Sequence, residues 1–176
     1  MVTIDHFMYA VPTLEAGMRW AAARFDAEPA YGGVHVGMGT RNALLSLGDC
    51  YLEIIAPDPA QSLSGNLGER FAQLEGGGLV TWAAQGVLAK IAQTLAAQGV
   101  ETTGPARTER RTAGGDLLVW ELLFPKASSF GPRMPFFIDW LACPHPRVTS
   151  PRGGRFAGLA ITTPDAGTLR RVLTSL

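Results

Sequence analysis

Two stretches, IDHFMYAVP at residues 4 to 12 and YLEIIAPDP at residues 51 to 59, each place one ionisable side chain inside an apolar run. Alternate residues of a strand share a face, so His6 and Glu53 each face the same way as apolar neighbours two positions away. Burying either side chain without a partner is costly. The two are therefore either a structural hydrogen-bonded pair or part of a metal or acid–base site.

The composition is that of an ordinary globular chain. Of 176 residues, 47% are hydrophobic and 17% are charged, which suffices for one sizeable core. Fifteen basic residues balance fifteen acidic ones, so no net field attracts nucleic acid or anionic lipid. We therefore expect neither a nucleic-acid partner nor a membrane partner.

Cysteine usage and hydropathy bear on location. Cys50 and Cys143 lie far apart and have no zinc-site spacing, which is typical of buried thiols in a reducing compartment. The N-terminus has no signal-peptide pattern, and no stretch approaches the roughly 20 apolar residues of a membrane span. These features predict a cytoplasmic protein.

The order of elements repeats along the chain. A strand, a helix and three further strands are expected in residues 1–62, and the glycines at 76–78 mark a boundary after which the same order returns in residues 77–147. Residues 155–176 resemble a third start that stops after one strand and one helix. We predict an α+β fold of two βαβββ modules within residues 1–150, plus a C-terminal strand–helix fragment.

The repeat also allows positions in the two modules to be compared. The sequence APDP at 56–59 aligns with CPHP at 143–146, which places Trp140 opposite Glu53. The first strands align with Thr81 opposite His6. The C-terminal fragment leaves an apolar face and an open strand edge, which proteins usually cover. We expect it to pack on the first module or to form a homodimer contact.

These segments, together with the loop GGVHVGMGTRN and the strand PFFIDWLAC, resemble the vicinal oxygen chelate superfamily, and within it the glyoxalase-like domain proteins. The resemblance covers nearly the whole chain. It implies a curved, mixed and largely antiparallel sheet of eight strands with helices on its convex face and a divalent metal ion (Zn, Fe, Mn or Ni) on its concave side. Members include isomerases, dioxygenases, transferases and drug-binding proteins, so the fold does not define the reaction.

The resemblance also implies which residues hold the metal. The usual ligands are a His from the first strand and a Glu from the fourth strand of each module, and His6 and Glu53 match the first pair. Thr81 and Trp140 stand at the second pair's positions and are not plausible ligands. Because catalytic sites usually have three protein ligands, a third must come from elsewhere.

Three residues are candidates for that ligand, in the order His35, Glu121 and Asp139, and the first two are also candidates for the general base. His35 lies in a loop whose glycines permit close approach to a ligand. Glu121 is a buried carboxylate if its strand face is the interior one. With Glu53, His35 and Glu121 complete the candidate catalytic set. His35 can equally be an exposed loop residue, and Glu53 can be a structural partner of His6.

Four further residues are candidates for substrate contact. Arg41 and Asn42 lie in the same glycine-rich segment, and a guanidinium pairs well with carboxylate or phosphate. Trp140, and with it Trp82, makes a pocket more apolar, although aromatic residues of this kind more often fill a core. The predicted ligand is a small, partly hydrophobic molecule.

Two functions of different classes follow. In the first, the chain is a metal-dependent lyase, isomerase or dioxygenase that acts on a small oxygen-bearing metabolite, with the ion as Lewis acid. In the second, it is a metal-free protein that binds or sequesters a small molecule in the same concave pocket. The missing second-module ligands favour the second function.

Overall fold

The computed structural model describes residues 1–112, 114–126 and 129–176. Its elements, in chain order, are β1 (Thr3–Ala10), α1 (Leu14–Phe25), β2 (Ala30–His35), β3 (Thr40–Ser46), β4 (Tyr51–Pro57), α2 (Leu67–Ala72), β5 (Gly78–Gln85), α3 (Leu88–Ala97), β6 (Thr102–Arg111), β7 (Leu117–Pro125), the 3-10 helix η1 (Gly131–Arg133), β8 (Phe136–Asp139), α4 (Pro146–Thr149) and α5 (Ala166–Thr174). Within these residues, no helix has the length and apolar character needed to cross a bilayer.

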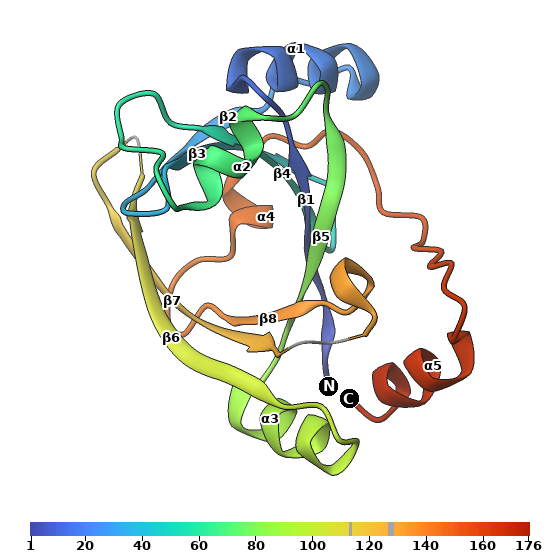
Figure 1. Cartoon of the computed structure of the whole chain (residues 1–176). Helices are drawn as coiled ribbons and strands as arrows, with labels where there is room; N and C mark the ends of the chain where they lie inside the picture. Colours follow the sequence, from blue (N-terminus) through green and yellow to red (C-terminus); the bar gives the residue numbers. More distant parts are fainter. Residues whose placement is uncertain (113, 127–128) are drawn as a thin grey trace.

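The eight strands form one sheet in the order β2-β3-β4-β1-β5-β8-β7-β6 (Figure 1). Strand β1 runs parallel to β4, and β5 runs parallel to β8, while the other neighbouring strands are antiparallel. The two βαβββ modules meet where β1 pairs with β5. The predicted α+β architecture and the doubled module are confirmed.

The sheet curls so strongly that its two edge strands approach each other. Strands β2 and β6, at opposite ends of the strand order, are in contact. Gly33 of β2 makes this approach possible: its φ is +141°, and a Cβ built there would lie 2.6 Å from the carbonyl oxygen of Arg111 on β6. A side chain at Gly33 would push the edges apart, so the glycine-rich segment shapes the concave side.

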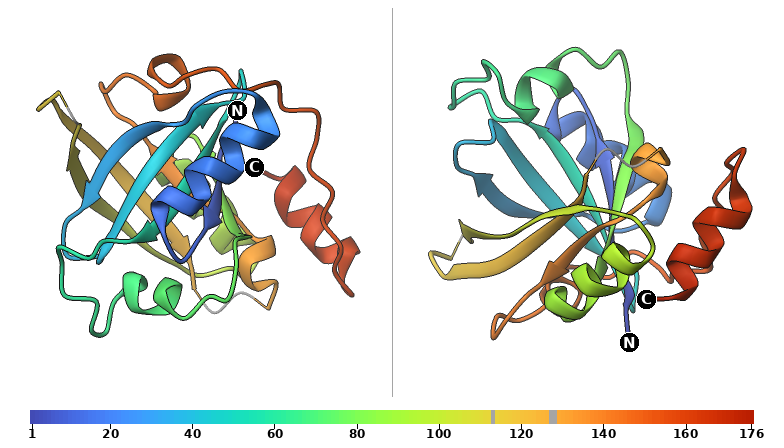
Figure 2. Two further views of the ribbon diagram at one scale, coloured as in Figure 1. Left: turned by 90° about the horizontal axis from the view of Figure 1, so that it is seen from above. Right: turned by 60° about the horizontal axis from the view of Figure 1, so that its bottom comes forward.

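Helices cover the convex face of the sheet (Figure 2). The main core joins that face to α1, α3 and α5 through residues such as Leu14, Ile91 and Leu169. Trp82 belongs to this core. Smaller apolar clusters occupy the concave side, one around Trp120 and one beneath α2 around Phe71.

The C-terminal segment packs on the convex core. Leu169 and Val172 of α5 are 3% exposed, and Phe156 packs against the same core. The strand predicted at the start of this segment is absent: the structure assigns no strand to residues 153–163. Near its start, Gly153 and Phe156 donate backbone hydrogen bonds to Ser46 and Leu47 at the end of β3. The rest of the segment then crosses the outer face of the sheet and forms no ladder.

The register of the strands corrects one alignment made from sequence. His6 of β1 pairs with Ala83 of β5, and Met8 of β1 pairs with Thr81 of β5. These two pairs are related by the approximate two-fold axis between the modules, so Thr81 is the counterpart of His6, as predicted, and Ala83 is the counterpart of Met8. On the parallel strands, Met8 lies beside Glu53 and its counterpart Ala83 lies beside Phe136. Phe136 is therefore the counterpart of Glu53. The predicted counterpart, Trp140, lies beyond the end of β8. The prediction aligned the Pro-containing segments that follow β4 and β8, but β4 has seven residues and β8 has four, so that alignment does not match positions within the strands.

Candidate functional site

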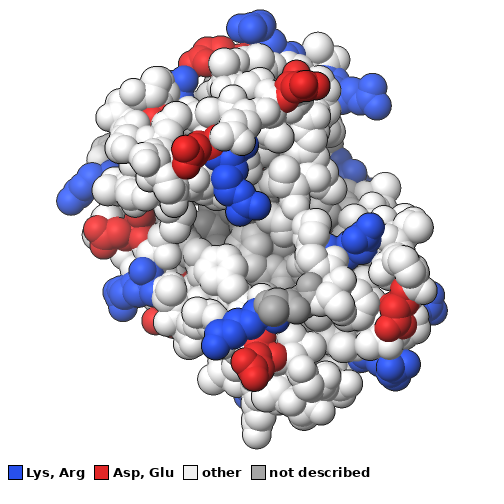
Figure 3. Space-filling model, viewed as in Figure 1, with Lys and Arg blue, Asp and Glu red and all other residues white. Residues whose placement is uncertain are grey.

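The concave side of the sheet holds a cavity of about 790 Å³ that both modules line. Most of its lining residues are apolar or aromatic, among them Ile55, Trp120 and Phe136. The face shown in Figure 3 is hollowed at its centre, and few charged side chains reach the hollow. Such a lining, interrupted by a small number of polar groups, is typical of sites for small molecules.

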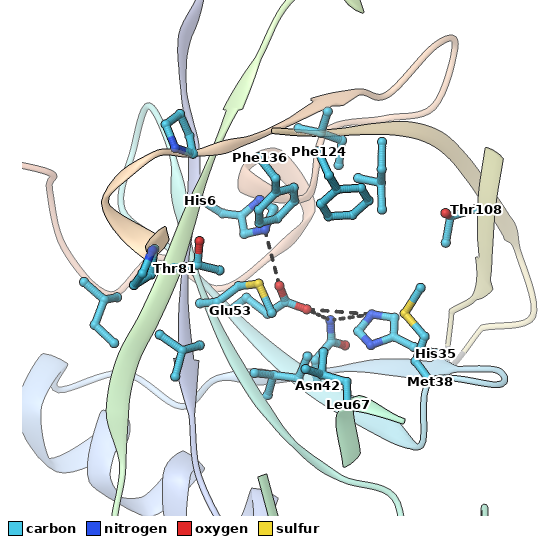
Figure 4. A pocket seen from close by; sticks show the side chains of 18 of the residues that line it. His6, His35, Met38, Asn42, Glu53, Leu67, Thr81, Thr108, Phe124 and Phe136 are labelled. Carbon is cyan, nitrogen blue, oxygen red and sulfur yellow. Dashed lines mark hydrogen bonds and ion pairs between the residues drawn. The ribbon is translucent and has the colours of Figure 1, made fainter. Parts of the chain in front are cut away.

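Three of the predicted site residues converge on the floor of this cavity (Figure 4). His6 Nε2 lies 3.4 Å from Glu53 Oε2, and His35 Nε2 lies 3.7 Å from Glu53 Oε1. The structure thus confirms that the side chains from β1 and β4 meet. Each imidazole faces a different oxygen of the same carboxylate.

Both histidines are held in place through their other ring nitrogen. His6 Nδ1 lies 2.6 Å from Asp5 Oδ1, and the imidazole of His6 stacks on Tyr51 with ring centroids 4.7 Å apart. His35 Nδ1 lies 3.0 Å from the hydroxyl of Thr40. Because both rings are oriented in this way, their Nε2 atoms are directed towards Glu53 and the cavity.

A bulge in β1 brings Asp5 to the same side as His6. The pairing of β1 with β5 shifts register between Ile4 and His6, which makes Asp5 an extra residue in the strand. Asp5 is fully buried, and its Oδ2 accepts hydrogen bonds from Trp140 Nε1 at 3.0 Å and from His145 Nε2 at 2.9 Å. The backbone N–H of Arg147 donates to His145 Nδ1, so Nε2 of His145 carries the proton.

A second set of hydrogen bonds links the site to the other module. The side-chain amide of Asn42 donates to Glu53 Oε1 at 2.6 Å and lies 3.3 Å from His35 Nε2. Its carbonyl oxygen Oδ1 accepts from Arg110 Nη1 of β6 at 2.7 Å. Polar contacts therefore run without a break from Arg110 through Asn42, Glu53 and His6 to Asp5.

The electrostatics of this network separate the two histidines. Burial alone would lower the pKa of His6, but hydrogen bonds and charge from Asp5 and Glu53 outweigh it and raise the pKa to about 9. Burial lowers the pKa of His35; the charge of Glu53 opposes this, whereas the charges of Arg110 and His6 add to it, so the pKa stays below its ordinary value. At neutral pH, His6 is protonated and His35 is neutral.

The two carboxylates remain ionised. Burial acts to raise the pKa of Glu53, but the hydrogen bond and charge of His6 lower it to about 2. Burial likewise acts to raise the pKa of Asp5, and hydrogen bonds from His145 and His6 outweigh it and hold that pKa well below its ordinary value. On the cavity floor, the protonated His6 thus lies between the ionised carboxylates of Asp5 and Glu53, and each of these charged groups has a hydrogen-bonded partner.

The residues do not fit the divalent ion that the resemblance implies. Two imidazoles and a carboxylate are suitable donors, but no group of three His, Cys, Asp or Glu side chains in the described part of the chain is placed to hold one ion. The amide of Asn42 contacts both His35 Nε2 and Glu53 Oε1, which puts a hydrogen-bond donor between two of the predicted ligands. Only His6 and Glu53 remain, and two ligands are too few for a typical catalytic zinc site.

Three predicted site residues lie outside the cavity. Arg41 has the opposite parity to Asn42 and forms an exposed ion pair with Glu15, its Nη2 lying 2.8 Å from Oε1. Glu121 points away because Trp120 and its even-numbered neighbours on β7 face the cavity. Trp82 lies in the convex core, where its indole N–H donates to the carbonyl of Arg133. Strand parity therefore argues against the roles expected for these three side chains.

Trp140 and Asn42 do line the cavity, and sequence reasoning missed three residues of the site. Asp5 is hard to find because simple alternation puts it on the face opposite to His6. His145 follows a proline outside the expected sheet, although the adjacent prolines signal a fixed backbone. Arg110 belongs to a basic run that is typical of a solvated face, yet it is only 5% exposed.

Comparisons with known proteins agree with this architecture. A family model for the glyoxalase-like domain matches residues 4–176, and the chain belongs to that family within the vicinal oxygen chelate superfamily. No curated protein matches the sequence.

Solved structures share the fold at low sequence identity. A hypothetical protein from Staphylococcus aureus has a TM-score of 0.66 and 21% identity over 81% of this chain, which spans only 60% of that protein's length. Methylmalonyl-CoA epimerase from Mycobacterium tuberculosis has a TM-score of 0.55 and 20% identity, covering 77% of this chain and 84% of the other. A Streptomyces coelicolor methylmalonyl-CoA epimerase in complex with 2-nitronate-propionyl-CoA has a TM-score of 0.54 and 20% identity, covering 77% of this chain and 94% of the other. At these identities the likeness extends to the fold alone.

Proposed function

We propose that the chain is an isomerase or lyase that transfers a proton to or from a small, largely apolar metabolite carrying oxygen. One observation carries the proposal: two imidazoles with opposite protonation states face one carboxylate at the floor of a cavity of about 790 Å³. Titratable groups whose surroundings push their pKa values apart are the mark of an acid–base pair.

His35 has the properties of the base. Its Nε2 lies 3.3 Å from the Asn42 amide, which can only donate, so that nitrogen carries a lone pair and Nδ1–H is left to donate to Thr40. A neutral imidazole with a free Nε2 lone pair can remove a proton from a carbon next to a carbonyl group. To act, Nε2 exchanges the long amide contact for the substrate's proton.

His6 has the properties of the acid. Its pKa of about 9 keeps it protonated at neutral pH, and Asp5 accepts from Nδ1, so Nε2–H is directed towards Glu53 and the cavity. When a substrate C–H loses its proton to His35, the electron pair moves onto the carbonyl oxygen, and His6 stabilises that oxygen by a hydrogen bond. Each such group contributes typically 10²- to 10⁴-fold to a rate.

The fold family agrees with chemistry of this kind without specifying the substrate. Structures with the same fold include methylmalonyl-CoA epimerases bound to CoA esters, so the fold hosts epimerases that act on acyl compounds. Proton transfer uses the two imidazoles on the cavity floor, whose pKa values are shifted in opposite directions, and this pairing is what favours an isomerase or lyase.

Hydrogen exchange with the solvent tests the proposal before the natural substrate is known. The protein is incubated in D₂O with a panel of hydroxy acids, oxo acids, lactones and thioesters, and mass spectrometry detects deuterium on carbon. We expect at least one compound to exchange with the wild type, and His35→Gln to reduce that rate by about 10²-fold or more. Arg41→Gln, which changes a half-buried residue outside the cavity, is the matched control.

Other outcomes would replace the proposal. A panel member that binds without exchanging in any variant would favour the metal-free binding protein, which the largely apolar cavity wall also suits. Elemental analysis of the native protein separates the remaining alternative. A stoichiometric divalent ion that is lost in both His6→Ala and Glu53→Ala, without unfolding, would instead support the metal-dependent enzyme.

A further inference from the structure

Arg110 is a buried cation that the proposed proton transfer does not use. It projects from β6 into the cavity and is 5% exposed. Its Nη1 donates a hydrogen bond to Asn42 Oδ1, and its Nε has no partner among the described residues. No acidic side chain in the described ranges forms an ion pair with it.

The surroundings fix the guanidinium in this position. A Cβ built on Gly32 would collide with Nη1 of Arg110 and with the side-chain oxygen of Asn42, and one built on Gly33 would lie 3.0 Å from Cδ of Arg110. The side chain therefore crosses the two glycines of β2 where the edges of the sheet meet. Because the guanidinium is held before any ligand arrives, a ligand would lose little affinity to its ordering.

A buried guanidinium of this kind calls for an anion. Arginine is rarely buried without a charged partner, because leaving water is costly for a charge that is not compensated. Glu53 does not supply the partner, since Asn42 lies between the two and Glu53 is already matched to His6. The free donors of Arg110 form a fork that suits the two oxygens of a carboxylate.

We propose that Arg110 binds the carboxylate of the substrate, so that the ligands of this protein are carboxylic acids with an apolar body. The proposal rests on the proposed function, because it concerns the same cavity. Asn42 touches both Arg110 and His35, which places the acidic end of the ligand beside the proposed base. The apolar body then lies against side chains such as Phe71 and Phe124.

The rim of the cavity supports this polarity. Arg70 of α2 is exposed and belongs to the cavity lining, so a second positive charge stands at the entrance. Arg70 at the entrance and Arg110 on the floor therefore both favour a ligand that carries a negative charge.

Binding of paired acids and amides tests the inference. The probes are the straight-chain acids from butanoate to decanoate and their primary amides, which differ from the acids in charge but hardly in shape. Affinity is measured by calorimetry and by quenching of the cavity residues Trp120 and Trp140. For the wild type we expect at least one acid to bind about tenfold or more tightly than its amide.

Variants then assign the preference to one residue. We expect Arg110→Gln to remove the preference for the acid while leaving amide affinity within about twofold, and Arg110→Lys to keep part of it because the charge remains but the fork is lost. Arg107→Gln, an exposed arginine on the same strand, should change neither. Thermal melting checks that each variant is folded. The comparison of acid with amide in the wild type needs no variant, so it tests the inference even if a variant fails to fold.

The outcomes separate this inference from the proposed function. Amides that bind as tightly as acids would overturn the role of Arg110 and leave the cavity as a small-molecule site. A preference for the acid that persists in folded Arg110→Gln would likewise overturn it. Failure of every acid and amide to bind would count against both, whereas acids that bind without solvent exchange would preserve this inference and count against proton transfer.

Discussion

Replacing Asp5 with asparagine isolates the contribution of one buried charge. In the wild type, Asp5 accepts from His6, Trp140 and His145, at 2.6, 3.0 and 2.9 Å. Asparagine has the same shape but only one acceptor oxygen, which must serve the indole of Trp140, since that group can only donate. The amide NH₂ of Asp5→Asn then faces His6 Nδ1, and His6 has to become neutral to accept from it.

The expected cost follows from the charge-assisted contact that is lost. Removing one partner of a buried ion pair costs several kcal/mol, and hydrogen bonds to charged groups contribute roughly 1.5–3 kcal/mol each. Because asparagine retains two of the three contacts, we expect Asp5→Asn to lower the free energy of unfolding by about 3 kcal/mol at pH 6. For a chain of this length, that corresponds to a fall in Tm of roughly 6–12 °C.

The same change should alter how stability depends on pH. The pKa of His6 rises from its ordinary value of 6.5 to about 9 in the folded protein, so His6 stabilises the fold fully below pH 6.5, and this stability is lost as pH rises through 9. The difference between these two pKa values corresponds to about 3 kcal/mol. The pKa of Glu53 shifts in the opposite direction, from 4.5 to about 2. This shift changes the free energy of unfolding only below pH 4.5, so it does not overlap the range in which the contribution of His6 is lost.

Urea unfolding between pH 6 and pH 9 measures both effects. The wild type should lose about 3 kcal/mol across this range, and Asp5→Asn should start lower and vary little. Nuclear magnetic resonance of labelled histidine should show the pKa of His6 falling in the variant. Asp116→Asn, an exposed substitution of the same kind, is the control. A variant as stable as the wild type at pH 6, or one that keeps the alkaline slope, would refute the reasoning.

Three further predictions concern other parts of the structure. Gly32→Ala places a methyl group against the hydrogen bond between Asn42 and Arg110. We expect urea unfolding to show a free energy of unfolding lower by about 1–3 kcal/mol, and an unchanged value would mean that the edges of the sheet separate freely. Leu169→Ala should lower the free energy of unfolding by about 2–5 kcal/mol, because α5 packs into the convex core. A loss below about 1 kcal/mol would show that α5 does not contribute to that core. Arg41→Ala should change thermal stability by less than about 1 kcal/mol, because its ion pair is exposed, and a larger loss would contradict its placement outside the site.

Several features of the site were predictable from local sequence. His6 and Glu53 stand out because each is an ionisable residue in an apolar run, and an isolated buried charge needs a partner. Their contact at 3.4 Å confirms that reasoning. The glycines around His35 were expected to permit close approach to a ligand, which stays a prediction; in the structure Gly32 and Gly33 lie against Arg110 and Arg111 of β6.

Other features could not be predicted, because the pattern that reveals the faces of a strand is weak there. Strand β3 is buried on both faces along most of its length, so its hydrophobic residues do not alternate and the sequence does not say whether Arg41 or Asn42 faces inward. The apolar run of β7 leaves Glu121 equally ambiguous. The bulge at Asp5 reverses the expected side of one residue, and only the pairing of β1 with β5 reveals it.

The sequence by itself determined the two modules, their strands and helices, and the pair of buried side chains around which the cavity forms, since these depend on periodicity and on local turn residues. Only the tertiary structure decided which residues join that pair. The curl of the sheet brings β6 to β2, and the segment after β8 brings Trp140 and His145 to Asp5. These contacts span 68 to 140 residues of chain, so they depend on strand order and register and leave no signature in any local pattern.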